Sequence, residues 1–525
     1  MKYIPFAALS PNTVERIKYL ILASLTIIFI AIFSVSLSWR VRGDAVFLHY
    51  LAYLINEHGF VPYRDLFELN MPGTYLFHIM IGKLFGYSTY VLRAVNIAWL
   101  AATLVITWFI MQPFGKKTAV AGCLLFSIIY LGHGTEMSLQ RDFIVILPIA
   151  IALLITVQRQ PHHAANLTHF LLGILFAFVA LVKPYHAIGL PVLIVYNCMQ
   201  DGDKSVSALF KPCLVGGILA LLGFLLIVII PLIWLWHIGA LAVFGDIFAS
   251  YTPLYAQISG DLTIRSTFSH IIYILYSYTH FINIGMLLLA SGLGAYIFVT
   301  RPTSIITKQL AVLLFLFSVL YALSAGIGGK LWNYHLIPYM YFVSLSAAIT
   351  LYSPPLFANV YRSNIIPILV FIMAITPIVL KSTVKHVILR SKSAYELSIE
   401  MRMDEISTYL QTHLATGDKV QLLHWAGGVM EPMLAAKAIT ATRYITDFQF
   451  YHHVSTPYIQ SLRKDFMIRL NKAMPKFIID VYALHKLSGA DTSYEFPELK
   501  AFIKQHYKKD YIGNNEFNIF RRNDG

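Results

Sequence analysis

Long runs of apolar side chains dominate the first 380 residues of this chain. A helix needs about 20 mostly apolar residues to cross a bilayer, because the hydrocarbon core is about 30 Å thick and each residue adds about 1.5 Å. Eleven runs reach or approach this length, and they cover residues 19–38, 89–111, 118–134, 143–158, 168–182, 186–199, 213–237, 281–299, 309–326, 335–352 and 364–380. The pattern predicts a polytopic α-helical membrane protein with about 11 transmembrane helices.

The remaining residues, 381–525, have a different pattern. Short apolar segments at 419–425, 476–482 and 515–522 predict strands, and residues 393–414 and 496–507 predict helices. This alternation favours a small α/β domain. We therefore expect a transmembrane domain over residues 1–380, with outer loops at 39–88 and 238–280, followed by a soluble α/β domain over residues 381–525.

Composition supports this division. Of all residues 57% are hydrophobic and only 13% are charged, whereas a soluble domain has about 25% charged residues. Residues 381–525 alone hold 20 of the 40 Lys and Arg and 15 of the 26 Asp and Glu. In a membrane protein, a net charge of +14 is typical of basic loops that face anionic lipid. The sequence has no basic tract with interleaved aromatic residues, which would indicate binding to nucleic acid.

The short loops predict the orientation of the helices. If eleven helices alternate, basic residues before helix one and after helices two, four, six, eight and ten all fall on one side: Arg16, Lys18, Lys116, Lys117, Arg159, Lys204, Lys211, Arg301, Lys308 and Arg362. The positive-inside rule makes that side cytoplasmic. The N-terminus is then cytoplasmic, and the first loop (residues 39–88) and the C-terminal domain are extracytoplasmic.

Candidate chemistry lies in the predicted outer segments, because ionisable groups near hydrocarbon are costly and usually mark function. The first loop has Asp44 directly after Gly43, an amphipathic stretch over residues 47–55, and a turn-rich segment that contains Arg64, Asp65 and Glu68. A loop of this length with a carboxylate near each end is more than a connector.

Three further outer segments carry charge. HGTEMSLQRDF contains Glu136 and Asp142, VKPYH contains Lys183 and His186, and GGKLWNYHLIP contains Lys330, Tyr334 and His335. Each has a structural alternative: an ion pair between Arg141 and Asp142, a lysine that snorkels to the interface, or a histidine satisfied at a helix end. Together, carboxylates and cations beside a bilayer suit a reaction between a phosphate-bearing lipid and a second substrate, with a carboxylate as general base and cations on the departing phosphate.

The chain resembles the GT-C class of integral membrane glycosyltransferases, which use polyprenyl-phosphate-linked sugars, and in particular the bacterial group related to protein mannosyltransferases and aminoarabinose transferases. Four features carry the resemblance: the acid after helix one with GFVPYRDLFELNMPGTYL, the acid in QRDF, the segment GGKLWNYHLIP, and a C-terminal domain after the last helix. The resemblance implies a GT-C fold, the bacterial inner membrane, and inverting transfer of a sugar to an envelope glycan, lipid or protein.

The resemblance also implies roles for single residues. Asp44 corresponds to the family's first-loop acid, the general base or acceptor-binding group, and Asp142 to its second-loop acid, with Glu136 as the alternative. Candidates for contact with the donor phosphate are Lys183, Lys330, His335 and Arg93, and further first-loop or late-helix candidates are Arg64, Asp65, Glu68 and Tyr334. A divalent metal ion shared by Asp44 and Asp142 is a possible cofactor, although the first loop has no Asp-x-Asp motif.

Two other functions fit parts of the pattern. A transporter or flippase of lipid-linked sugars would also have about a dozen helices, but it would place ionisable residues near the middle of the bilayer and show paired halves. A non-catalytic subunit of envelope assembly would have dispensable outer carboxylates. The concentration of charge at one face favours the transferase.

Overall fold

The computed structural model describes residues 11–159, 165–200, 205–258, 284–300, 303–327, 332–351, 365–388, 394–423, 428–482, 491–513 and 517–523. The chain forms two compact units. The helical unit comprises Met1–Arg40, Arg93–Ile229 and Thr267–Ser391. The loop–domain unit comprises Val41–Leu92, Ile230–Ser266 and Lys392–Gly525, so it joins most of the first loop to the C-terminal domain.

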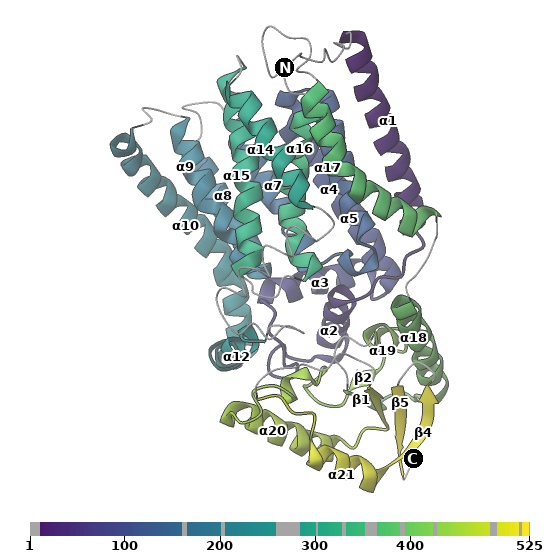
Figure 1. Ribbon diagram of the computed structural model, residues 1–525. Coiled ribbons are helices and arrows are strands. Elements are labelled where there is room, and N and C mark those ends of the chain that lie inside the picture. Colours follow the sequence, from purple (N-terminus) through teal and green to yellow (C-terminus); the bar gives the residue numbers. More distant parts are fainter. Residues whose placement is uncertain are drawn as a thin grey trace. The chain divides into compact units, whose positions relative to one another are not determined.

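The helical unit is built almost entirely from helices (Figure 1). Its elements are α1 (Pro11–Ser36), α4 (Thr89–Met111), η1 (Gln112–Phe114), α5 (Lys116–Gly132), η2 (Thr135–Met137), α6 (Arg141–Ile144), α7 (Ile146–Gln158), α8 (Ala165–Val182), η3 (Pro184–Ile188), α9 (Gly189–Met199), α10 (Val206–His237), α14 (Ile284–Thr300), α15 (Ile305–Ile327), η5 (Asn333–Leu336), α16 (Ile337–Leu351), α17 (Ile365–Thr383) and η7 (Val384–Ile388). Helices α4 and α10 extend into the loop–domain unit at one end.

Among the described residues, eight helices are long and apolar enough to cross a membrane: Asn12–Ser36, Thr89–Phe114, Arg141–Gln158, Ala165–Val182, Ser207–His237, Ile305–Gly326, Asn333–Leu351 and Ile366–Ile388. Three other predicted runs form shorter helices, α5 and α14 with 17 residues each and α9 with 11. The polytopic helical class is confirmed, and the count of about 11 transmembrane helices stays a prediction.

Helix α16 is the core of the helical unit. All of its residues from Ile337 to Leu351 are buried, and it packs against α5, α14, α15 and α17. Its small residues allow close approach: a Cβ on Gly294 of α14 would lie 2.7 Å from the Thr350 hydroxyl oxygen. Small residues at helix contacts are the usual way in which membrane helices pack, because van der Waals contact has to replace the hydrophobic effect there.

The loop–domain unit contains α2 (Asp44–His58) and α3 (Pro72–Phe85) of the first loop. A second segment adds α11 (Leu241–Asp246), the π-helix η4 (Ile247–Tyr251) and α12 (Thr252–Ala256). The C-terminal part consists of α18 (Ala394–His413), β1 (Lys419–Leu423), α19 (Met430–Ala435), β2 (Ile439–Thr440), η8 (Phe448–Phe450), α20 (Pro457–Ala473), β3 (Phe477–Val481), α21 (Pro497–His506), β4 (Tyr507–Gly513) and β5 (Phe517–Arg522).

The five strands form one mixed sheet in the order β2-β1-β3-β5-β4. Strand β1 is parallel to β2 and β3, with Val420 opposite Phe477, and β5 is antiparallel to β3 and β4. Parallel neighbours need crossover connections, and α19 and α20 provide them. The predicted α/β domain is thereby confirmed, with each predicted strand and helix in its place.

Candidate functional site

A buried carboxylate in the helical unit collects several polar side chains. Asp142 lies in α6, and its side chain is completely buried. Lys183 Nζ donates a hydrogen bond to Asp142 Oδ2 at 2.8 Å, and His186 Nε2 lies 2.8 Å from Oδ1. The Tyr185 hydroxyl donates to Oδ1 at 3.4 Å. We call Asp142, Lys183, Tyr185 and His186 the Asp142 network.

A proline explains how three neighbouring residues reach the same acid. The residue before a proline is disfavoured in the helical conformation, so α8 ends at Val182 and Lys183 is extended at φ −151° and ψ 94°. Pro184 then begins the short helix η3, which carries Tyr185 and His186. This turn brings all three side chains to Asp142.

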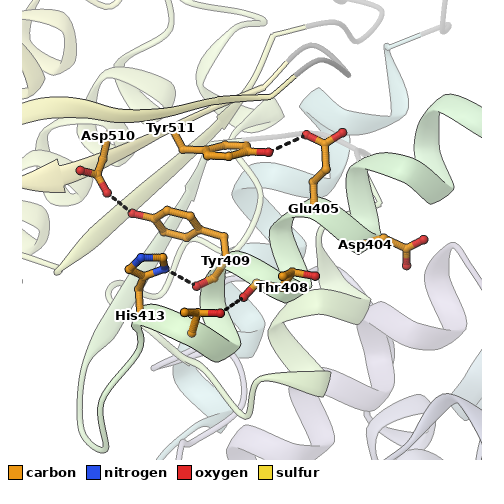
Figure 2. Close-up of a pocket in the computed structure, with 8 residues that line it drawn as sticks. Asp404, Glu405, Thr408, Tyr409, His413, Asp510 and Tyr511 are labelled. Carbon is orange, nitrogen blue, oxygen red and sulfur yellow. Dashed lines mark hydrogen bonds between the residues drawn. The ribbon is translucent and has the colours of Figure 1, made fainter.

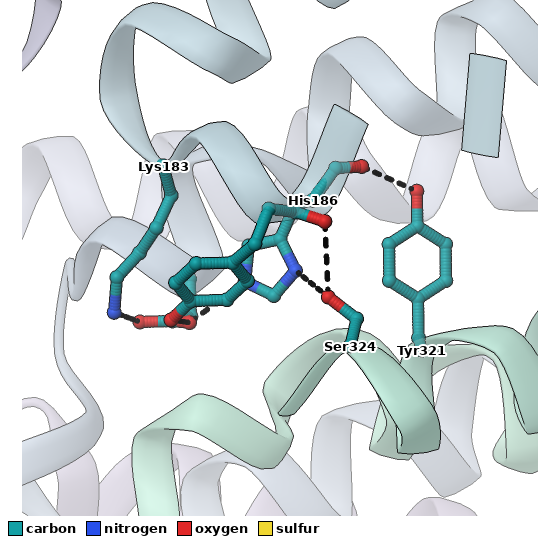
Figure 3. Close-up of polar contacts among 6 residues, drawn as sticks. Lys183, His186, Tyr321 and Ser324 are labelled. Atoms are coloured by element: carbon teal, nitrogen blue, oxygen red, sulfur yellow. Dashed lines mark hydrogen bonds and ion pairs between the residues drawn. The ribbon is translucent and has the colours of Figure 1, made fainter. Parts of the chain in front are cut away.

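Helix α15 supplies a second layer of hydrogen bonds (Figure 3). The Ser324 hydroxyl donates to the Tyr185 carbonyl oxygen at 3.1 Å and lies 3.2 Å from His186 Nδ1. The Tyr321 hydroxyl donates to the His186 carbonyl oxygen at 3.1 Å. Such outer partners orient the imidazole and hold it against Asp142.

Aromatic rings border the ammonium group of Lys183. Its Nζ lies 5.3 Å from the Tyr185 ring centroid and 5.5 Å from that of Tyr334. His335 follows Tyr334 in η5 and is buried, with its ring 6.5 Å from that of Tyr185. The structure therefore brings together four residues predicted from the sequence, Asp142, Lys183, Tyr334 and His335.

The hydrogen bonds of Asp142 limit its chemistry. A carboxylate that accepts from an ammonium and an imidazole is stabilised as the anion, which makes it a poor proton acceptor. A buried ion pair usually adds little net stability, and inside a membrane protein such a pair usually marks function. The arrangement suits the orientation of Lys183 and His186 more than proton transfer by Asp142 itself.

The surroundings of Asp142 do not fit a divalent metal ion. Both carboxylate oxygens already face hydrogen-bond donors, and Lys183 places a positive charge 2.8 Å from Oδ2. No group of three or more His, Cys, Asp or Glu side chains suited to a metal ion occurs in the part of the chain that the structure describes. Asp44 belongs to the other unit.

Arg93 is a second buried cation of the helical unit, on α4. Its Nη2 donates to the Ser36 hydroxyl oxygen at 2.6 Å, and its guanidinium carbon lies 5.7 Å from the Trp39 ring centroid. Only 7% of Arg93 is exposed, yet its Nε and Nη1 have no hydrogen-bond partner among the described residues. One turn further along α4, the buried amide nitrogen of Asn96 has none either.

The first loop holds Asp44 at the start of a helix. Gly43 adopts φ 76°, which glycine reaches without strain, and Asp44 is the first residue of α2. Asp44 is half-buried. An acid in the first turn of a helix interacts favourably with the helix dipole, so a structural role is the alternative to a catalytic one.

The other first-loop candidates stabilise turns. Arg64 pairs with Asp65 at 3.1 Å, and Asp65 Oδ2 also accepts from the Val61 amide at 2.9 Å. Partial burial raises the pKa of the Asp65 carboxyl, but the Arg64 and Val61 hydrogen bonds outweigh this effect and lower it. Glu68 Oε1 accepts from the Leu69 amide and from Asn70 Nδ2.

Two predicted site residues are not described as part of the Asp142 network. Glu136, in η2, is exposed, in contrast to the fully buried Asp142. Lys330 lies outside the described residues. Sequence reasoning placed His186 beside Lys183 without giving it a role, and it missed Tyr185, Tyr321 and Ser324. The available signal was the spacing of Lys, Tyr and His around Pro184.

A groove of about 560 Å³ lies in the C-terminal part of the loop–domain unit (Figure 2). It runs between α18 and β4 and is lined by Asp404, Glu405, Thr408, Tyr409, Thr412, His413, Asp510 and Tyr511. The Tyr409 hydroxyl donates to Asp510, and the Tyr511 hydroxyl donates to Glu405 at 3.2 Å. None of the predicted site residues lines this groove.

No protein-family model matches the chain, and no curated protein matches it. Solved structures do match. ArnT from Cupriavidus metallidurans, bound to undecaprenyl phosphate, has 12% sequence identity and a TM-score of 0.57, and the match covers 96% of this chain and 97% of ArnT. At this identity the match establishes the fold alone, and it confirms the predicted GT-C fold.

An oligosaccharyltransferase from Archaeoglobus fulgidus, in a complex with zinc and sulfate, is more distant. It has 12% identity and a TM-score of 0.46 over 95% of this chain and 73% of that chain. AglB from the same organism, with an inhibitory peptide and a dolichol-phosphate, has 11% identity and a TM-score of 0.44 over 88% of this chain and 69% of that chain.

Proposed function

We propose that this protein is a membrane glycosyltransferase that transfers a sugar, with inversion, from a polyprenyl-phosphate-linked donor to an envelope glycan, lipid or protein. The acceptor hydroxyl oxygen attacks the anomeric carbon, and the bond from that carbon to the phosphate oxygen breaks. Polyprenyl phosphate leaves with the bonding electrons. Asp44 accepts the proton of the acceptor hydroxyl.

The observation that carries the proposal is the charge of Arg93. Lys183, the other buried Lys or Arg among the described residues of the helical unit, is neutralised by Asp142, whereas two N–H groups of Arg93 have no acceptor among the described residues. A buried guanidinium is costly unless an anion binds it, and its fork of donors suits a phosphate. A polyprenyl phosphate would supply this anion, and a protein of the same fold, ArnT, binds undecaprenyl phosphate.

The Asp142 network has a separate role in this proposal. Lys183 and His335, set among aromatic rings, contact the departing phosphate as hydrogen-bond donors, and Arg93 supplies the uncompensated positive charge. Asp142 holds Lys183 and His186 in place. Lys330 is the remaining predicted phosphate contact.

The position of the charges along their helices favours the transferase over a transporter. Asp142 lies at the start of the candidate span Arg141–Gln158, Lys183 directly follows the span Ala165–Val182, and His335 is in the first turn of Asn333–Leu351. A transporter site would sit near the middle of the bilayer instead.

Contacts inside the loop–domain unit support the predicted sidedness. The Tyr50 hydroxyl of the first loop donates to the Ala438 carbonyl oxygen, and the Tyr251 hydroxyl lies 2.9 Å from His452 Nε2. Residues that touch lie on one side of the membrane, so an even number of spans separates residue 50 from residue 251, and residue 251 from residue 438. If all eleven predicted helices cross, six spans lie between residues 50 and 251 and four lie between residues 251 and 438. Both numbers are even, and they require that the shorter helices α5, α9 and α14 also cross the membrane. We propose that this side is the outside of the bacterial inner membrane.

The test is mass analysis of envelope glycolipids, glycans and glycoproteins from a deletion strain, followed by transfer with purified protein and the lipid-linked sugar so identified. A missing sugar that purified protein restores to its acceptor in detergent supports the transferase. Accumulation of the intact lipid-linked sugar in the inner leaflet, without transfer by purified protein, would instead indicate a flippase.

A further inference from the structure

The C-terminal domain contacts the first loop at several points inside the loop–domain unit. Tyr50 and Tyr53 of α2 lie one helical turn apart and donate to consecutive carbonyl oxygens, those of Ala438 at 2.9 Å and Lys437 at 3.2 Å. Nearer the start of α2, Arg42 Nη1 donates to the Glu396 carbonyl oxygen at 3.3 Å. The middle of α2 and the residue two positions before its start are therefore hydrogen-bonded to the C-terminal domain.

Arg443 binds the turn-rich segment that follows α2. Its Nη2 donates to the Tyr63 carbonyl oxygen at 2.6 Å, and its own carbonyl oxygen accepts from the Phe67 amide at 2.8 Å. The guanidinium carbon lies 5.4 Å from the Phe67 ring centroid and 5.7 Å from that of Tyr444. One residue thus spans residues 63–67 through its side chain and its backbone.

The segment needs such support because its backbone is strained. Tyr63 adopts φ 64°, a left-handed conformation that bulky residues rarely take. Strain of this kind persists only where the surroundings over-determine the conformation. Here the Tyr63 hydroxyl donates to the Asn70 carbonyl oxygen at 2.6 Å, its ring is fully buried, and Arg443 binds its carbonyl oxygen.

We infer that Arg443 is a positioning residue that holds the first loop, and with it the helix that begins at Asp44, in its working conformation. The catalytic part of this inference rests on the proposed transferase function. The C-terminal domain then restrains the conformation of the first loop. Removal of the Arg443 side chain slows sugar transfer without loss of the lipid donor site.

The chain offers a matched control. Arg463 also donates to a backbone carbonyl oxygen, that of Phe450 at 2.8 Å, and its guanidinium carbon lies 4.7 Å from the Phe496 ring centroid. All three of these residues belong to the C-terminal part of the chain. Arg463→Met therefore removes a similar set of contacts that does not involve the first loop.

The experiment compares Arg443→Met, Arg443→Lys and Arg463→Met in the full-length protein in lipid nanodiscs. Hydrogen exchange of amides 61–70 is measured beside that of strands β1 and β3, and kcat and KM are measured for the lipid donor. For Arg443→Met we expect exchange in 61–70 to rise about tenfold with the strands unchanged, because a hydrogen bond from a charged donor is lost. We expect kcat to fall about tenfold with an unchanged KM.

The controls separate the outcomes. Arg443→Lys should have an exchange rate in 61–70 and a kcat between those of wild type and Arg443→Met. Arg463→Met should leave exchange in 61–70 and kcat unchanged. Unchanged exchange in 61–70 for Arg443→Met overturns the inference, as does an equal rise in the strands or a loosened loop with normal kcat. If the wild-type protein transfers no sugar, the proposed function fails, and the exchange data alone decide whether Arg443 holds the loop.

Discussion

Asp142 in the helical unit and Asp44 in the loop–domain unit are two of the predicted acids, and their surroundings differ. Asp142 is fully buried, and its oxygens face an ammonium, an imidazole and a phenol. Asp44 begins a helix and keeps part of its surface exposed. A carboxylate saturated by fixed donors suits positioning, whereas a partly exposed one can receive a proton from an entering acceptor.

The largest expected effect separates the two acids. Asp44→Asn should lower the rate of sugar transfer by about 10⁴-fold. Loss of a general base lowers a rate by about 10²- to 10⁴-fold, and the proposed mechanism assigns this role to Asp44 alone. The measurement is transfer by purified protein at matched concentration, with thermal unfolding to verify folding. Glu57→Gln, which removes an exposed acid near the other end of α2, is the control. Wild-type activity of Asp44→Asn would exclude Asp44 as the base.

A second test concerns the ion pair of the helical unit. Lys183→Met removes one partner and leaves Asp142 buried, which should destabilise the protein by about 3 to 5 kcal/mol. Thermal unfolding in detergent measures this change. The double variant Asp142→Leu with Lys183→Met should recover part of the loss, because neither partner is then left buried without the other. Equal stability of Lys183→Met and wild type would show that the pair is not buried as described.

The loop–domain unit also has a buried titratable residue, His49 in α2. Burial lowers its pKa from 6.5 to about 4, so the unfolded chain takes up a proton in this range and the folded one does not. Stability is therefore full above pH 6.5 and declines as the pH falls toward 4, by about 3 kcal/mol in total. His49→Phe should flatten this acid limb in unfolding curves measured from pH 4 to 8. An acid limb as steep as that of wild type would contradict the assignment.

The smallest expected effect is a stabilisation of the folded protein, and it tests Arg93, the second buried cation of the helical unit. Arg93→Met removes a guanidinium whose Nε and Nη1 find no acceptor in the part of the chain that the structure describes, so without ligand it should stabilise the protein by about 1 kcal/mol. The same variant should lose the rise in unfolding temperature that polyprenyl phosphate gives to wild type. Arg93→Lys, which keeps the charge, should retain part of that rise. A lower unfolding temperature without ligand, or an undiminished response to the lipid phosphate, would count against an anion site.

Local patterns predicted the elements of both units well. The amphipathic stretch at 47–55 became α2, and the segments at 419–425 and 476–482 became β1 and β3. Such elements are readable because burial imposes a period of two or 3.6 residues on neighbouring positions. The run at 186–199 was less readable, because its first residues belong to the short helix η3 and only Gly189–Met199 form α9.

The candidate site was predictable only as a set of residues. Asp142, Lys183 and His335 were chosen because charge is scarce in apolar segments, and the structure brings them together. The pairing of Lys183 with Asp142 was not predicted, and an ion pair of Asp142 with Arg141 was only the structural alternative. Residues 41 positions apart meet only if their helices are neighbours, and no local pattern states which helices are neighbours.

By itself, the sequence determined that this protein spans a membrane many times and ends in an α/β domain. A bilayer requires long apolar helices whose backbone groups are satisfied within each helix, so this information is local. Only the tertiary structure decided that Lys183 is neutralised by Asp142, that two N–H groups of Arg93 find no acceptor among the described residues, and that Arg443 binds the first loop. These facts depend on contacts between distant segments, which form when the helices and the sheet have packed.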